Sequence, residues 1–123
     1  MGISKLNKGT RFAFSYDKEG VKYFKTAEFV KAFGLDKVFK LRAAHINHGG
    51  RYGDSATLIV TAMDDDKAVF GINTPSHMVN LVQEILDSAE FIDEIDSQRA
   101  GVQAYEYQDK DGVTRYSFKF VDI

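Results

Sequence analysis

The chain has 123 residues, which fits one domain at roughly 100 to 200 residues per domain. Hydrophobic residues make up 44% and charged residues 28% of it, which excludes a disordered chain and a fibrous repeat. Cysteine is absent, which excludes disulfides, thiolate metal sites and cysteine nucleophiles. No apolar run reaches the roughly 18 residues of a membrane helix, and no apolar signal region follows the first lysines, so we expect a cytoplasmic protein.

The formal net charge of −2 hides a segregation of charge along the chain. Residues 1–62 carry 11 Lys and Arg against 5 Asp and Glu, whereas residues 63–99 carry 2 against 9. Separate basic and acidic surfaces allow a protein to bind a polyanion on one side and stay soluble through the other. The alternative interpretation is that one helix simply has an acidic face in solvent.

The first 36 residues are predicted to form a strand and a helix that extend the main domain. A strand is expected over 10–16, because aromatic side chains alternate there: Phe12, Phe14 and Tyr16. A short helix is expected over 25–33, with Thr26 as the cap and Gly34 as the C-terminal stop.

Three strands are predicted next, over 38–46, 55–63 and 68–73, from alternating and β-branched residues. Thr74 and Pro75 then open a helix, with the threonine hydroxyl as the cap and proline at the first helical position. A second helical stretch is expected to run to about Arg99. The chain is predicted to end in a hairpin of strands 102–107 and 113–121.

The order of these elements from residue 37 onward is typical of the five-stranded oligonucleotide-binding barrel (OB-fold). That fold is mainly β, with one main helix between its third and fourth strands. We therefore expect such a barrel over 37–123, with residues 1–36 as a strand-helix extension of the same domain. A generic α+β domain is the alternative, but it needs helices divided between strand pairs.

In such barrels the ligand lies over strands 2 and 3, between the loop joining strands 1 and 2 and the loop joining strands 4 and 5. Here these loops are predicted at 47–53 and 108–112. The first loop holds Arg51, which can bind phosphate, and Tyr52, whose ring can stack on any base. The alternative is a hairpin loop that needs glycine for its backbone, with Tyr52 packed on the sheet.

Further candidate binding residues lie on the predicted strands. Lys40 and Arg42 share one face of the first barrel strand, and Arg115 and Lys119 share one face of the last. Tyr107 is the second candidate for stacking on bases, after Tyr52. Exposed strand faces also carry lysine and arginine without any binding role, so a basic groove is one of two interpretations.

Two segments resemble a known group: HINHGGRYGDSATLIVTAMDDDKAVFGINTPSHMVNLVQEILDSAEFIDEI and GVQAYEYQDKDGVTRYSFKFVDI. The features concerned are the strand order, the Gly-Arg-Tyr-Gly loop, the Pro-Ser-His helix start and the Tyr-Ser-Phe closing strand. Over about 37–123 the chain resembles the small single-stranded DNA-binding proteins of tailed phages that infect lactococci and related bacteria. The resemblance implies an OB-fold protein that protects single strands during phage replication and recombination, without catalysis, in the host cytoplasm.

The sequence therefore predicts a non-enzymatic, sequence-tolerant binder of single-stranded DNA that needs no cofactor or metal. We expect a homo-oligomer, because several copies of a small barrel bind one DNA strand more tightly than a single copy does. Recombination or replication proteins are expected as further partners. Two alternatives remain. One is an OB-fold protein-interaction module that binds a replication or host protein through its acidic helix face. The other is a small metal-dependent nuclease using Asp64, Asp66 and Glu84.

Overall fold

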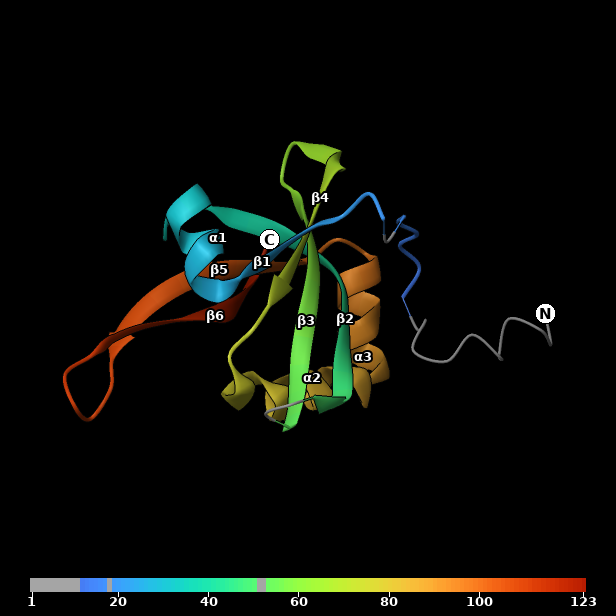
Figure 1. Ribbon diagram of the computed structural model, residues 1–123. Coiled ribbons are helices and arrows are strands. Elements are labelled where there is room, and N and C mark those ends of the chain that lie inside the picture. The colour runs from blue at the N-terminus through green and yellow to red at the C-terminus, as the bar shows by residue number, and fades with distance from the viewer. Residues whose placement is uncertain (1–11, 18, 51–52) are drawn as a thin grey trace.

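A computed structural model describes residues 12–17, 19–50 and 53–123. One six-stranded sheet, in the order β1-β4-β3-β2-β5-β6, curls into a half-barrel (Figure 1). Its strands are β1 (Lys22–Lys25), β2 (Val38–Gly50), β3 (Gly53–Ala62), β4 (Asp65–Asn73), β5 (Ala100–Gln108) and β6 (Thr114–Asp122). The β1–β4 pair is parallel and the other pairs are antiparallel.

The long strand β2 is the centre of the curl, because it pairs with β3 along most of its length and with β5 near its start. The β2–β3 register shifts between Leu41 and Ala43, and the β3–β4 register shifts between Thr61 and Ala62. Such bulges bend a strand and increase its twist. The sheet therefore curves around one apolar interior.

The described residues form three short α-helices and a 3₁₀ turn: α1 (Thr26–Phe33), η2 (Ser76–Met78), α2 (Val79–Leu86) and α3 (Ala89–Asp96). None of these helices has the length and apolar character needed to cross a membrane. At the start of α1 the Glu28 carboxylate accepts a hydrogen bond from the Lys25 amide at 2.8 Å, and Gly34 ends the helix with a φ of 83°. The Ser88 hydroxyl caps α3 by accepting from the Phe91 amide at 3.2 Å.

The mainly-β class is as predicted, but the expected strand count and helix placement are wrong. The sheet has six strands instead of five, because Lys22–Lys25 joins it beside β4. The main helix expected after Thr74 is divided into η2 and α2, the second helical stretch forms α3, and the helix expected over 25–33 is α1, which packs against the sheet. Thr74 does not cap a helix, because its hydroxyl donates to the Ala56 carbonyl oxygen at 2.9 Å.

The strand predicted over 10–16 is also wrong for its described residues. Phe12 is buried in the core cluster, and Phe14 and Tyr16 pack against that cluster, so the alternating aromatic pattern reports burial. Their backbone has no strand partner in the described part of the chain, and the Ala13 amide instead donates to the Asp96 carboxylate at 2.9 Å. The segment therefore lies on the fold without joining the sheet.

One part of the core is a cluster of phenylalanine rings in which α1 packs against the strands of the sheet. Phe29 of α1 lies 5.0 Å from Phe39 of β2 and 5.7 Å from Phe118 of β6, measured between ring centroids. Phe33 lies 5.1 Å from Phe70 of β4. These rings fill the open side of the half-barrel, so α1 is part of the core and not an appendage.

We predict that Phe29→Ala destabilises the protein by about 3 to 5 kcal/mol, because it removes a buried ring and leaves a cavity between three strands. Chemical denaturation measures this free energy of unfolding. Phe91→Ala is the matched control, since that ring is 50% exposed and its loss costs little stability. Equal losses in the two variants would contradict the assigned role of Phe29.

Candidate nucleic-acid interface

The β5–β6 hairpin, which projects from the body of the protein in Figure 1, carries aromatic and cationic side chains on one face. The register pairs Tyr107 with Arg115 and Tyr105 with Ser117, and Lys119 follows two residues further along β6. Opposed residues of an antiparallel pair share a face, as do alternate residues along a strand. The two tyrosines, Arg115 and Lys119 therefore share one face, which we call the hairpin face.

The two tyrosine rings of the hairpin face form a pair, with centroids 6.0 Å apart and planes inclined by 42°. Tyr105 is 36% exposed and Tyr107 is half-buried. A pair of partly exposed rings offers successive surfaces on which bases can stack.

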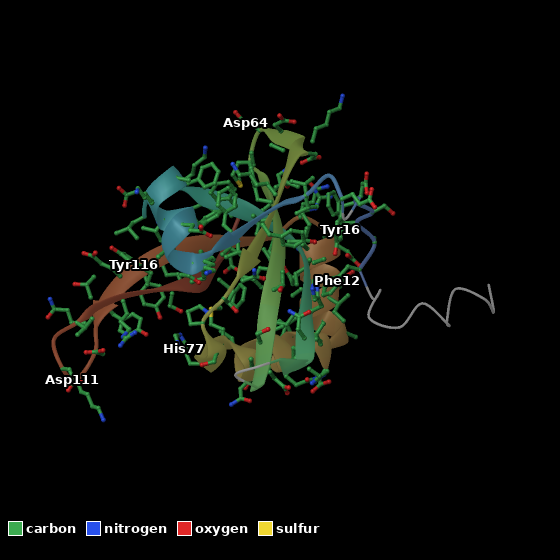
Figure 2. All side chains as sticks on the ribbon, in the orientation of Figure 1. Phe12, Tyr16, Asp64, His77, Asp111 and Tyr116 are labelled. Atoms are coloured by element: carbon green, nitrogen blue, oxygen red, sulfur yellow. The ribbon has the colours of Figure 1, made fainter. Side chains whose placement is uncertain are left out.

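His77 of η2 adds a third ring beside this pair, below the hairpin in Figure 2. Its ring lies 6.2 Å from that of Tyr107 in an edge-to-face arrangement, and its Nε2 is hydrogen-bonded to the Ser117 hydroxyl at 2.9 Å. The sequence pattern did not predict this contact. The partners are 40 residues apart, so no local pattern signals their approach.

The opposite face of the hairpin anchors it at one end. Ala104 pairs with Phe118, and both are buried in the core, whereas Glu106 pairs with Tyr116 further out. The base of the hairpin is therefore anchored in the core by apolar side chains. Its outer part carries the tyrosine pair and the cations on one face, and Glu106 and Tyr116 on the other.

Arg115 is held by Asp109 at the turn of the hairpin. The Arg115 Nε lies 2.8 Å from an Asp109 carboxylate oxygen, and the other oxygen accepts from the amides of Asp111 and Val113. The hydrogen bond from Arg115, followed by the backbone hydrogen bonds, lowers the pKa of Asp109. The ion pair fixes the turn and leaves the Arg115 side chain 58% exposed.

Lys40 and Arg42 were expected to form a basic groove with Arg115 and Lys119. They pair with a carboxylate instead. Lys40 Nζ and Arg42 Nη1 lie 3.1 Å and 3.3 Å from one carboxylate oxygen of Asp66, and their side chains are only 17% and 11% exposed. The Arg42 guanidinium also lies 4.1 Å from the centre of the Phe14 ring. Since β5 separates β2 from β6, these cations lie two strands from Arg115 and Lys119. The structure brings together Tyr107, Arg115 and Lys119, and holds Lys40 and Arg42 apart.

Arg51 and Tyr52 lie outside the described residues. On either side of them, Gly49 and Gly53 have φ values of 73° and 95°, the region that favours glycine. The Asp54 carboxylate accepts from the Gly49 amide at 3.3 Å and lies 3.1 Å from His48 Nδ1. The Gly49 hydrogen bond and then the His48 hydrogen bond lower the pKa of Asp54. The glycine requirement predicted for this loop is thus present at both of its ends.

Within the described residues there is no group of three or more histidine and carboxylate side chains placed to hold a metal ion. Of the carboxylates considered for a nuclease, Asp66 is engaged by Lys40 and Arg42. Asp64 lies in the β3–β4 turn, and Glu84 lies on α2.

No protein family, curated protein or solved structure matches the chain significantly.

We predict that Arg115→Gln raises the pKa of Asp109 toward the ordinary value of an aspartate. The pKa of Asp109 is lower in the folded than in the unfolded protein. Its contact with Arg115 therefore stabilises the hairpin turn at pH values above the ordinary pKa of an aspartate, and this stabilisation is lost as the pH falls through the folded pKa. An NMR titration of the Asp109 carboxyl carbon in both proteins measures the change. An unaltered pKa in Arg115→Gln would show that the backbone amides alone set it.

Proposed function

We propose that the protein binds single-stranded DNA with little sequence preference and without catalysis, through the hairpin face. The observation that carries this proposal is the tyrosine pair, Tyr105 and Tyr107, beside the exposed cations Arg115 and Lys119. Every base has a face that stacks on an aromatic ring, and cations follow the phosphate backbone whatever the sequence. Rings and cations on one strand face therefore suit a binder of single strands in general.

The connectivity of the strands supports the same proposal. One long strand, β2, pairs with both β3 and β5, and the helical segment stands between β4 and β5, as in the oligonucleotide-binding barrel. In that fold the two loops beside the ligand correspond to the β2–β3 and β5–β6 connections here. We include Arg51 and Tyr52 of the first connection on the sequence alone.

The burial of β3 favours the hairpin over the middle of the sheet as the main contact. Thr57, Ile59 and Thr61 lie on the opposite face of β3 from Leu58 and Val60, and the side chains of both faces are buried. A DNA strand cannot reach side chains that the protein already covers. The hairpin face, by contrast, presents Tyr105, Arg115 and Lys119 to solvent.

The role we propose is the coating and protection of single strands in replication or recombination of the phage type. It agrees with the resemblance of residues 37–123 to the phage single-stranded DNA-binding proteins. It also agrees with the position of the acidic helix α3, which lies far from the tip of the hairpin in Figure 1.

We predict that Tyr107→Ala weakens binding to oligo-dT by about 1 to 3 kcal/mol, the worth of one stacked base, with little change in salt dependence. Tyr116→Ala is the matched control, because Tyr116 lies on the opposite face of the same hairpin. Fluorescence anisotropy measures both affinities, and thermal melting checks that both proteins are folded. Equal losses in the two variants would place the DNA elsewhere.

We predict that Lys119→Ala makes the dependence of log affinity on log salt shallower by about 0.7, the value for one phosphate contact on single strands. Lys67→Ala, an exposed lysine beyond the β3–β4 turn, should leave the slope unchanged. Oligo-dT titrations over a series of salt concentrations give both slopes. If the affinity of the wild-type protein for oligo-dT did not vary with salt, contacts between these cations and DNA phosphates would be excluded.

A further inference from the structure

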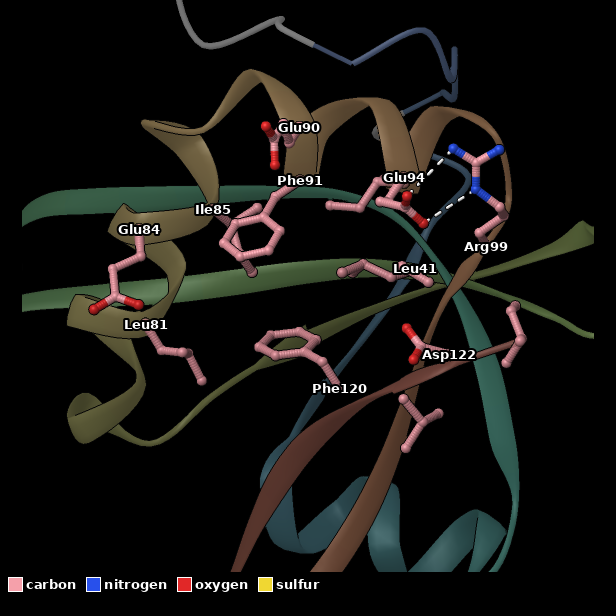
Figure 3. A pocket seen from close by; sticks show the side chains of 14 residues that line it. Leu41, Leu81, Glu84, Ile85, Glu90, Phe91, Glu94, Arg99, Phe120 and Asp122 are labelled. Atoms are coloured by element: carbon pink, nitrogen blue, oxygen red, sulfur yellow. Dashed lines mark hydrogen bonds and ion pairs between the residues drawn. The ribbon is translucent and has the colours of Figure 1, made fainter.

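An apolar groove lies between the two acidic helices and the C-terminal strand (Figure 3). It has a volume of about 710 Å³, and we call it the α2–α3 groove. Three of the large hydrophobic side chains that the described residues expose line it: Phe91 at 50%, Leu81 at 40% and Ile123 at 39%. Apolar side chains gathered and exposed in this way mark an interaction site more often than single ones do.

Acidic side chains surround the groove. Glu84, Glu90, Glu94 and Asp122 line it, together with the single cation Arg99. Arg99 is already paired with Glu94 at 3.1 Å and with Asp93 at 3.4 Å. Glu84, Glu90 and Asp122 form no ion pair with any residue that the structure describes. The groove therefore presents an apolar floor and an unbalanced negative rim.

A surface of the opposite sign lies on β1 and α1, and we call it the β1–α1 patch. Its exposed lysines are Lys22, Lys25 and Lys31, with Lys37 just before β2, and they outnumber the exposed carboxylates of the same segment, Glu28 and Asp36. Within the described parts of the chain none of these lysines has an ion-pair partner. Lys22 and Lys37 lie over the rings of Phe24 and Phe33, at 5.2 Å and 5.6 Å.

The β1–α1 patch also offers an aromatic ring. Tyr23 is 43% exposed on β1, an edge strand of the sheet, and its ring packs directly over Gly71, which holds it in place. Figure 1 shows α1 to the left of the central strands, α2 below them and α3 to their right, so the patch and the groove are separate surfaces of one molecule.

We propose that the α2–α3 groove binds the β1–α1 patch of a second copy of this chain. The groove is apolar with an acidic rim, and the patch offers an exposed tyrosine ring and lysines, so the two surfaces are complementary in charge and in apolar character. Each copy of the chain carries one groove and one patch. A contact between two grooves would place acidic rims against each other, which is unfavourable. Because groove and patch are different surfaces, the contact is head-to-tail and extends from copy to copy unless it closes into a ring.

The proposed contact lies outside the hairpin face and leaves it uncovered. It does not depend on DNA binding. A contact of this kind, built from one groove and a few exposed lysines, belongs to the weak class of interfaces and weakens as salt screens its charges.

The test is a charge exchange between the two surfaces, read by sedimentation and light scattering without DNA. The groove variant carries Glu84→Lys and Glu90→Lys, and the patch variant carries Lys25→Glu and Lys31→Glu. The matched controls are Asp111→Lys and Lys110→Glu, at the hairpin turn far from both surfaces. Circular dichroism and melting confirm that each protein is folded.

Wild-type protein at low salt should rise above the 13.8 kDa chain mass with concentration and return to it at high salt. Each charge variant alone should associate about tenfold more weakly, and the controls should match wild type. An equimolar mixture of the two variants should regain association, because each reversed surface then meets its complement. Phe91→Ser should also weaken association, without a change of charge.

The proposal would be overturned if the measured mass of the wild-type protein stayed at that of a single chain at every concentration. It would also be overturned by variants that associate like wild type, or by a mixture that stays as weak as its components. The oligo-dT affinity of the two variants is measured separately, and the hairpin tyrosines remain intact in both. Loss of self-association is therefore distinguishable from loss of DNA binding.

Discussion

The packing of phenylalanines at the open side of the sheet is the constraint on which the rest of the structure depends. A half-barrel has two free edges, and between them its interior would be open to water. Here α1 contacts both β4 and β6 and places Phe29 against Phe39 and Phe118. Side-chain packing closes this side of the fold where a closed barrel would use strand pairing.

This closure determines where a ligand can bind. Phe118 fixes the root of the β5–β6 hairpin in the core, so the outer part of the hairpin extends with Tyr107 and Arg115 on one face. The N-terminal segment occupies another surface, where the Phe14 ring lies against Arg42. Cations that look equivalent in the sequence are therefore divided. Arg42 is nearly buried beside Asp66 and Phe14, whereas Lys119 remains exposed.

The sequence was most informative where a pattern has a local cause. Alternating and β-branched residues identified β2, β3, β4 and the hairpin, and Gly34 correctly marked the end of α1. Thr26, expected as the cap of α1, is wrong, because its hydroxyl donates to the Asn73 carbonyl oxygen. The pattern of Phe12, Phe14 and Tyr16 predicted burial correctly and strand pairing wrongly, because alternation does not reveal where a backbone finds its partners. The strand Lys22–Lys25 has too few residues to show a period.

For the candidate site, one strand face was predictable and its surroundings were not. The spacing of Arg115 and Lys119 predicted that both lie on one face of their strand, and the β5–β6 register confirms it. The pairing of Lys40 and Arg42 with Asp66, and of His77 with Ser117, joins residues far apart in the chain. Such contacts depend on how the sheet curls, which no local spacing encodes.

The most direct test of DNA binding at the hairpin face is an NMR titration of the isotope-labelled protein with oligo-dT. We expect the largest changes in chemical shift at 103–107 and 115–119, with the side-chain signals of Tyr105 and Tyr107 among them. The α2–α3 groove should change little at high salt, where self-association is suppressed. Shifts confined to α1 or to the groove, or no shifts at saturating oligo-dT, would contradict the account.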